Sequence, residues 1–411
     1  MIKKLLKISF KFILVAFVLV AISYGGFHLW EYATGGKYVI FLSKNSETIP
    51  LEKSFSFERM EQDIANNHLI LVGEIHGFHE PSVFDVDFFK YLHENHNVNH
   101  YIAELDFVQA QLLNDFLYSG DEKLLQRILE NWAVIQGRNN KDYFEKYIHL
   151  QQYFQQLPEN EKFKFVGIDL IQDENLVKEY LNSFYPSDSL GNKVEKDGST
   201  LNETIERLTT IYSQNTDTLF LLSHLKKNAD YILNKENREE IMFQNFHSLF
   251  SYNKWSESKL YGFFGLYHVF QYRINNSHPL ASKIRKSNLG LKNKILSINF
   301  MMNDSYMVMP SNQLPEFMRE KGAYTRIPVS ADNMLFMYII GVKDFKRMTP
   351  QHHKSLIKMD APNSPYINSM RLSKTIQLLP VTDQFEMNDE GLPYVQYTVF
   401  VRNSDWAAPM K

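Results

Sequence analysis

One apolar segment that ends in a charged turn constrains the fold of this chain most. Leu69–Val72 is a run of four apolar residues that suits a buried strand, and it leads directly into Gly73. Glu74 and His76 follow at once, and the flanking glycines let the backbone bend around them. Because open α/β sheets place their chemistry at strand ends, this pair predicts proton abstraction or metal binding. The alternative is that Glu74 caps the next helix while His76 lies in a polar loop.

The rest of the chain alternates strands with helices, which is typical of a parallel sheet with right-handed crossovers. Predicted strands cover residues 69–72, 101–105, 163–168, 259–269, 295–301, 335–342 and 395–402, with a short strand or linker edge at 38–42. Predicted helices cover residues 57–66 and 83–94, the region 108–157, and most of 174–251 with breaks near 186–199 and 234–237. Residues 343–365 are too rich in turn formers to assign.

This pattern predicts an α/β fold with a mainly parallel sheet, flanking helices and a helical cap. We expect residues 36–411 to form one domain, in which 108–157 and 174–251 are largely helical insertions. With 411 residues and 44% hydrophobic side chains, the chain can build a sizeable core. The net charge of −3 gives no electrostatic case for nucleic acid. The lack of cysteine excludes disulfides and thiol chemistry. A small-molecule or peptide substrate is the expected partner.

Residues 1–35 predict a membrane segment. Four lysines between residues 3 and 11 precede a charge-free stretch over residues 12–30. As a helix this stretch is about 28 Å long, close to the thickness of the hydrocarbon core. The lysines favour the cytoplasmic side, so we expect a single-pass bacterial inner-membrane anchor with the domain outside the cytoplasm. A cleaved signal peptide is the competing interpretation, although Trp30 and Tyr32 look like interfacial anchors.

Acidic side chains end each of the three best-defined strands. Glu74 with His76 follows the first strand, Glu104 ends the second, and Asp169 follows the third. Because the carboxyl ends of parallel strands lie at one edge of a sheet, we expect these four side chains to converge. Burying carboxylates is costly without partners, so three of them exceed what a structural sheet requires. For Glu104 or Asp169 taken singly, helix capping is the alternative.

Five short motifs follow one another along the chain. They are Gly-Glu-Ile-His-Gly at 73–77, Ala-Glu-Leu at 103–105, Gly-Ile-Asp at 167–169, Arg-Glu-Glu-Ile-Met-Phe-Gln-Asn at 238–245 and Gly-Phe-Phe-Gly-Leu-Tyr-His at 262–268. In order and spacing this set resembles the superfamily that joins erythromycin esterase-like proteins, ChaN-like haem-uptake proteins and the TraB/Tiki group. The resemblance covers about residues 66–305 and implies a shared α/β fold.

The resemblance also implies an active site. In the esterase-like branch an early Glu and His, a second-strand Glu and a late His form the site. Carried onto this chain, these residues are Glu74, His76, Glu104 and His268. Arg238 is implied as a structural or anion-binding partner, and Asp169 and Asn245 are candidates for supporting the site.

Two departures from the esterase pattern put macrolide esterase activity in doubt. Ile75 alone separates the Glu from the His, which is closer to the ChaN-like form, and Gln271 stands where the esterase branch tends to carry a second late histidine. The family therefore implies a site and a fold rather than a substrate.

The first mechanism that these side chains suggest is hydrolysis without a cofactor. His76 or His268, oriented by Glu74 or Glu104, would take a proton from water for attack on an ester, lactone or amide carbonyl. Arg238 would stabilise the oxyanion.

Two alternatives involve a bound group. His76 and His79 stand three apart, and Glu104 and His268 would complete a nitrogen and oxygen site for zinc or manganese. Haem binding of the ChaN-like kind is the second alternative, because the chain has 23 Tyr and 31 Phe and tyrosine or histidine can ligate haem iron.

Other histidines are weaker candidates. His93, His96 and His100 precede the second strand, which predicts a solvated turn at the amino end of the sheet. His149 and His247 lie on predicted helices, and His352 and His353 lie in the unassigned region. Trp132 and Arg138, in the helical cap, are candidates for lining a substrate pocket.

Overall fold

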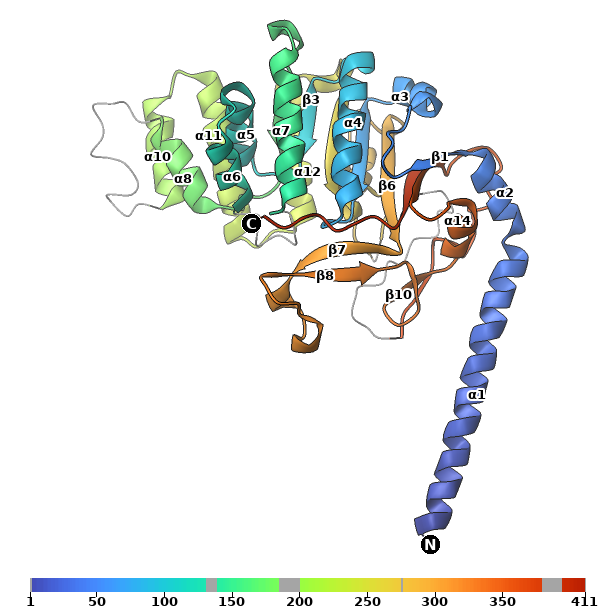
Figure 1. Cartoon of the computed structure of the whole chain (residues 1–411). Coiled ribbons are helices and arrows are strands. Elements are labelled where there is room, and N and C mark those ends of the chain that lie inside the picture. Colours follow the sequence, from blue (N-terminus) through green and yellow to red (C-terminus); the bar gives the residue numbers. More distant parts are fainter. Residues whose placement is uncertain (1, 131–138, 185–199, 275, 379–393, 411) are drawn as a thin grey trace.

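The computed structural model describes residues 2–130, 139–184, 200–274, 276–378 and 394–410. Its centre is an eight-stranded sheet, and the six strands from β13 to β4 are parallel to one another (Figure 1). In spatial order the strands are β1 (Ser46–Pro50), β11 (His353–Lys358), β13 (Tyr397–Arg402), β6 (Ile295–Asn303), β2 (Leu69–Glu74), β5 (Leu260–Gly265), β3 (His100–Ala103) and β4 (Lys164–Gly167). The predicted α/β fold with a mainly parallel sheet is confirmed.

Helices cover both faces of this sheet, because alternate residues of each buried strand point to opposite sides. Ile70 and Val72 of β2 pack with α4 (His79–His96), α5 (Phe107–Ser119) and α7 (Lys141–Gln156). Leu69 and Leu71 pack on the other face with α12 (Arg238–Tyr252) and α13 (Leu280–Lys286). The remaining helices of this part are α3 (Glu61–Asn66), α6 (Glu122–Glu130), α8 (Glu174–Asn182), α10 (Leu201–Ile211) and α11 (Thr216–Leu233).

The helical character predicted for 108–157 and 174–251 is confirmed within the described residues. The predicted break at 186–199 and the pocket candidates Trp132 and Arg138 fall outside them. Three of the helices that follow β4, namely α8, α10 and α11, form a separate apolar cluster that also includes Val108 of α5.

Several elements near the chain ends differ from the prediction. Residues 38–42 belong to a helix, α2 (Gly36–Lys44), because Tyr38, Phe41 and Leu42 recur at helical spacing and are buried on one face. The region left unassigned contains α14 (Val342–Met348) and strand β11. Of the strand predicted at 335–342, only β10 (Met337–Ile339) forms, in a small sheet with β9 (Asp332–Asn333) and β12 (Thr375–Ile376).

An antiparallel hairpin that the sequence pattern did not predict covers the carboxyl edge of the sheet. It consists of β7 (Ser305–Pro310) and β8 (Tyr324–Val329), and it follows directly on β6. The carbonyl oxygen of Gly77 accepts hydrogen bonds from the backbone N–H groups of Val308 and Ala407, both at 2.9 Å. Gly77 has φ +90°, and a Cβ there would lie 2.8 Å from the Val308 oxygen, so only glycine fits. The hairpin and the C-terminal segment thereby fix the loop that carries His76.

The N-terminal helix α1 (Ile2–Thr34) projects from the domain as an isolated rod (Figure 1). The most apolar part of its candidate span Ile13–Thr34 has a mean hydropathy of 2.0 and is not buried, so by length and composition the helix can cross a membrane or act as a signal sequence. Within the described residues it is the one helix with these properties.

Candidate active site

The predicted site residues lie at the carboxyl ends of neighbouring strands. Glu74 is the last residue of β2, Glu104 follows β3, and Asp169 lies just beyond β4. His268 lies on η6 (Leu266–Val269), a 3-10 turn directly after β5, which runs between β2 and β3. The topology therefore brings together residues that are almost 200 positions apart in the chain.

Glu74 and His76 form a carboxylate–imidazole pair. His76 Nδ1 lies 2.8 Å from Glu74 Oε1, and the Tyr143 hydroxyl donates to the same oxygen. Glu74 is buried, and its Oε2 makes no hydrogen bond within the described structure. The first helix after the pair, α4, has Phe78 as its N-cap without a side-chain cap bond, so the helix-capping alternative for Glu74 is wrong.

A buried ion pair beneath the sheet edge positions Tyr143. Lys146 Nζ lies 2.9 Å from Asp85 Oδ2 and 4.2 Å from the centre of the Tyr143 ring. Asp85 also accepts hydrogen bonds from the hydroxyls of Tyr101 and Tyr261. Burial raises the pKa of Asp85, while Lys146 and the two tyrosines oppose that shift. Because every member is buried and paired, the network holds the start of α7 firmly against Glu74.

Glu104 is the centre of a second cluster. Its Oε1 accepts from Arg238 Nη2 at 2.6 Å and lies 3.4 Å from His268 Nε2. Its Oε2 accepts the backbone N–H of Gly265 at 2.5 Å. Three donors directed at one carboxylate stabilise its ionised form.

Arg238 joins Glu104 to Asp169. Its Nε donates to Asp169 Oδ1 at 2.9 Å and its Nη2 to Asp169 Oδ2 at 2.5 Å, a bidentate arrangement. Burial works against the charge of Arg238, but the two carboxylates outweigh it and raise the pKa. The N-caps of α5 and α8 are Asp106 and Asp173, so neither Glu104 nor Asp169 is a helix cap.

His268 lies between two carboxylates. Its Nδ1 is 2.7 Å from Glu239 Oε1, and its Nε2 faces Glu104. Burial alone would lower the pKa of His268, but Glu104 and Glu239 outweigh burial and raise it to about 9. His268 is therefore a cation at neutral pH.

Gly265 separates the two clusters. A Cβ at this position would lie 3.0 Å from His76 Nε2 and 3.4 Å from Glu104 Oε2. The imidazole of the first cluster and the carboxylate of the second thus border the same small space, which a side chain at 265 would fill.

Of the four candidate metal ligands, His79 lies apart from the other three. His79 leaves the site and pairs with Asp142, 2.9 Å from its Nδ1, and this hydrogen bond raises its pKa. Among the residues that the structure describes, no three His, Asp or Glu side chains are arranged to hold a metal ion. These residues do not fit the proposed zinc or manganese site, and haem binding stays a prediction.

Histidines at the amino end of the sheet are structural, and the prediction of a solvated turn is wrong for two of them. His93 is buried on α4, with its ring nitrogens 2.7 Å from the Tyr153 hydroxyl and 2.8 Å from the Glu161 carbonyl oxygen. His100 opens β3 and receives a hydrogen bond from Trp255 Nε1, and burial lowers its pKa to about 4. His149 is exposed on α7, as a surface helix position allows.

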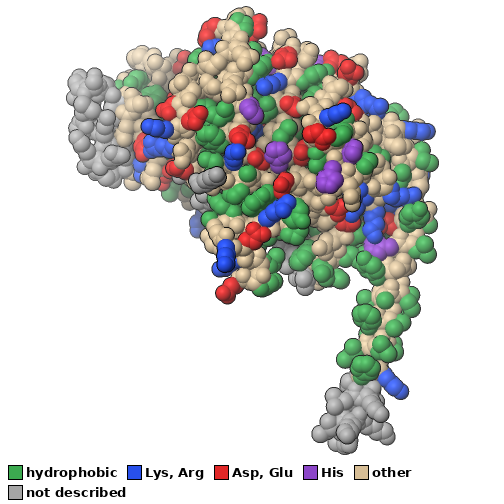
Figure 2. Space-filling model, in the orientation of Figure 1, with side chains coloured by type: hydrophobic (Ala, Val, Ile, Leu, Met, Phe, Trp, Pro, Cys, Tyr) green, Lys and Arg blue, Asp and Glu red, His purple; other side chains and the backbone are tan. Residues whose placement is uncertain are grey.

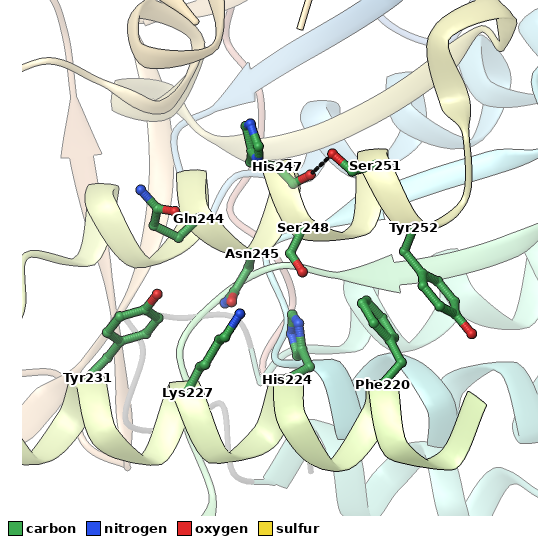
Figure 3. A pocket seen from close by; sticks show the side chains of 10 residues that line it. All are labelled: Phe220, His224, Lys227, Tyr231, Gln244, Asn245, His247, Ser248, Ser251 and Tyr252. Atoms are coloured by element: carbon green, nitrogen blue, oxygen red, sulfur yellow. Dashed lines mark hydrogen bonds between the residues drawn. The ribbon is translucent and has the colours of Figure 1, made fainter. Parts of the chain in front are cut away.

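Asn245 of α12 stabilises the backbone next to Asp169. Its Nδ2 donates to the carbonyl oxygen of Ile168 at 3.0 Å and so holds the chain as it leaves β4 toward Asp169. Asn245 also lines an open groove of about 510 Å³ between α11 and α12, in which His224 and Ser248 face each other (Figure 3). The His224 Nε2 is buried there and has no hydrogen-bond partner among the described residues. Gln271 stands where the esterase pattern tends to have a second late histidine. Its side chain donates hydrogen bonds to Ile295 and Ser297 of β6 and to Gln396, so it stabilises the position of β6.

Three members of the site were not predicted. Glu239 directly follows Arg238 and lies within the motif at 238–245. Gly265 is the last residue of β5, so the expectation that site residues lie at the carboxyl ends of strands also applies to it. Tyr143 lies in a long helical region with no local signal.

The fold recurs in solved structures of very different sequence. A Bacillus cereus protein has a TM-score of 0.63 at 13% identity, covering 92% of this chain and 99% of that one. A succinoglycan biosynthesis protein has a TM-score of 0.62 at 14% identity, with coverages of 92% and 99%. A mutant of the erythromycin esterase EreC in its open conformation has a TM-score of 0.52 at 14% identity, with coverages of 87% and 98%. No family model and no curated protein sequence matches the chain. These likenesses show the fold that the resemblance implied.

Proposed function

We propose that this protein is a membrane-anchored hydrolase in which His76 activates water for attack on an ester, lactone or amide carbonyl. The observation that carries the proposal is the pair in which the buried Glu74 holds Nδ1 of the partly exposed His76 at 2.8 Å. A carboxylate at Nδ1 keeps the imidazole proton on that nitrogen, so that Nε2 can act as the base. The fold shared with an erythromycin esterase supports hydrolysis at the level of analogy.

The charge of His268 favours His76 as the base over the alternative that the sequence left open. A histidine with a pKa near 9 already carries its proton at neutral pH and cannot accept another. His268 instead contributes positive charge beside Glu104. Arg238, whose side chain is 37% exposed, is the cation that can reach a substrate oxygen and stabilise an oxyanion.

The reaction follows from these roles. His76 Nε2 takes one proton from water as the water oxygen forms a bond to the carbonyl carbon. The resulting oxyanion is stabilised by Arg238. Collapse of the tetrahedral intermediate breaks the bond to the leaving alcohol or amine, which receives the proton from His76. No covalent acyl-enzyme is required, in keeping with the absence of cysteine.

The anchored state is part of the proposal. The lysines before residue 12 favour the cytoplasmic side, which would place the domain outside the cytoplasm. Glu31, on the last turns of α1, is buried against the domain, which supports an anchor that stays attached rather than a leader that is removed.

Hydrolysis is tested with the full chain reconstituted in lipid nanodiscs and assayed on soluble and lipid-borne esters, lactones and amides. We expect His76→Ala to lower kcat/KM about 10²–10⁴-fold on any substrate that the wild type turns over. His149→Ala is the matched control, because His149 is exposed on α7. Equal turnover by wild type and His76→Ala on a confirmed substrate would remove His76 from the mechanism.

A further inference from the structure

We propose that exposed apolar side chains on the α1 side of the domain form a rim that sits in the lipid bilayer and turns the carboxyl edge of the sheet toward the membrane. The rim comprises Phe317, Leu335, Phe336, Met370 and Leu378. The proposal rests on the anchoring stated above and goes beyond it, because an anchor alone leaves the orientation of the domain open.

The end of α1 is built into the domain rather than joined to it by a free linker. Gly341 N–H donates to Glu31 Oε1 at 2.7 Å, and the Tyr338 hydroxyl donates to the other carboxylate oxygen. Arg371 donates to the Glu31 carbonyl oxygen at 2.7 Å and to the Thr34 hydroxyl at 2.7 Å. Since Glu31 is only 1% exposed, these bonds are shielded from water and fix the direction in which the helix leaves the domain.

The domain contacts α1 within the membrane-spanning stretch itself. The rings of Phe27 and His28 lie 5.7 Å and 5.5 Å from the ring of Tyr338 in β10. Both residues lie inside the apolar span Ile13–Thr34. Whatever depth Phe27 has in the bilayer, strand β10 therefore has a similar depth.

Apolar side chains are exposed at this level. Leu335 and Phe336, on the turn that enters β10, are 51% and 42% exposed. The backbone N–H of Leu378 bonds the Met334 oxygen at 3.0 Å, which brings its exposed side chain alongside. Single exposed apolar residues are ordinary, but a group beside a membrane helix marks a surface that lipid can cover.

Phe317 extends the rim to the far end of the β7–β8 hairpin. Its side chain is 88% exposed, and the hairpin lies on the side of the domain from which α1 leaves (Figure 1). Its charged neighbours Glu316 and Arg319 suit the headgroup region better than the hydrocarbon core. Figure 2 shows hydrophobic side chains along α1 and on this lower edge of the domain.

The orientation has a consequence for the candidate site. Strand β6 ends where β7 begins, and Gly77 bonds to Val308 of β7, so the carboxyl edge of the sheet faces the hairpin. With the rim in the bilayer, the Glu–His site faces the membrane surface, and its substrate approaches from that side.

The absence of cysteine makes a depth measurement direct, because each single-cysteine variant carries one spin label only. Full-length Leu335→Cys, Phe336→Cys and Phe317→Cys, labelled with a nitroxide in liposomes, are probed with oxygen, which partitions into lipid, and with a water-soluble nickel chelate. We expect oxygen collisions to dominate at the first two positions and to rise above the aqueous level at Phe317. Ile22→Cys on α1 reports the anchor itself, and Leu233→Cys, exposed at the end of α11, reports water.

Each outcome decides the question. Lipid-like collisions at Ile22, Leu335 and Phe336, with water-like collisions at Leu233, support the rim. Lipid-like collisions at Ile22 with water-like collisions at Leu335 and Phe336 overturn the rim and leave the anchor. Water-like collisions at Ile22 overturn both, while hydrolysis by the Glu–His site stays a separate question.

Discussion

The two carboxylate–imidazole pairs of the candidate site are built from the same residue types and differ in charge. His76 has one carboxylate partner, Glu74, which a tyrosine hydroxyl also contacts. His268 lies between two carboxylates, and its pKa is raised to about 9. The identity of a residue therefore does not by itself assign its role. The number of opposing charges around each ring separates a proposed base from a fixed cation.

The largest expected effect comes from weakening the first pair alone. Glu74→Gln preserves the size of the side chain but removes the charge that holds the proton on His76 Nδ1. We expect kcat to fall about 10³-fold with little change in KM, measured by steady-state kinetics. Glu145→Gln, exposed on α7, is the control. Full activity in Glu74→Gln would show that the first pair is structural.

The raised pKa of His268 in the second pair should make the free energy of unfolding depend on pH. The folded pKa of His268 lies above the unfolded value of about 6.5, so its contribution is fully present below about pH 6.5 and is lost as the pH rises through about 9. We expect the free energy of unfolding to fall by on the order of 3 kcal/mol across this window. Urea unfolding at several pH values measures it. In His268→Gln this decline should disappear, whereas His149→Gln should keep it.

Arg238 belongs to the second cluster, and removing it should destabilise the fold more than removing a surface arginine. Arg238→Gln leaves Asp169 buried without a cation and leaves Glu104 with His268 as its remaining cation. We expect a loss of about 2 kcal/mol in urea unfolding, below the usual cost for a fully buried pair because Arg238 is partly exposed. Arg326→Gln, which breaks a surface pair with Asp405, should cost less than about 1 kcal/mol. Equal losses would contradict the difference in burial.

The smallest effect is expected at Tyr143. Tyr143→Phe removes the hydroxyl that donates to Glu74 and leaves the ring over Lys146 in place. One hydrogen bond to a charged group is worth about 1.5 kcal/mol, so kcat should fall roughly 10-fold. Tyr153→Phe is the matched control, because Tyr153 lies on the same helix but is bonded to His93. It should change kcat less than twofold, which corresponds to about 0.4 kcal/mol in activation free energy. If both variants behave alike, Tyr143 has no special link to the first pair.

The sequence predicted the sheet and the convergence of its acids because both depend on local patterns. Apolar runs that end in Glu74, Glu104 and Asp169 mark the strands and their carboxyl ends directly. Contacts between side chains that are far apart in the sequence could not be predicted in this way. Whether His268 meets one carboxylate or two depends on where α12 places Glu239, and that follows from packing rather than from any local pattern.

The same limit explains the errors. His79 stands three residues from His76, but the chain turns at Gly77 between them. His79 therefore points away from His76 and pairs with Asp142. The hairpin β7–β8 and strand β11 lie in sequence that is poor in clear periodicity. They form because the carboxyl edge of the sheet and β13, the last of its parallel strands, offer hydrogen-bond partners.

NMR can observe the ring nitrogens of His76 and His268 separately and so distinguish their roles. The full chain, labelled with ¹⁵N-histidine and reconstituted in nanodiscs, would be examined by NMR at about pH 8, with His76→Gln and His268→Gln used to assign the two signals. We expect His268 to carry protons on both nitrogens and to lose one near pH 9, while Nδ1 of His76 carries a proton directed at Glu74. A neutral His268 at this pH, or a proton on Nε2 of His76 alone, would contradict the separation of base from cation.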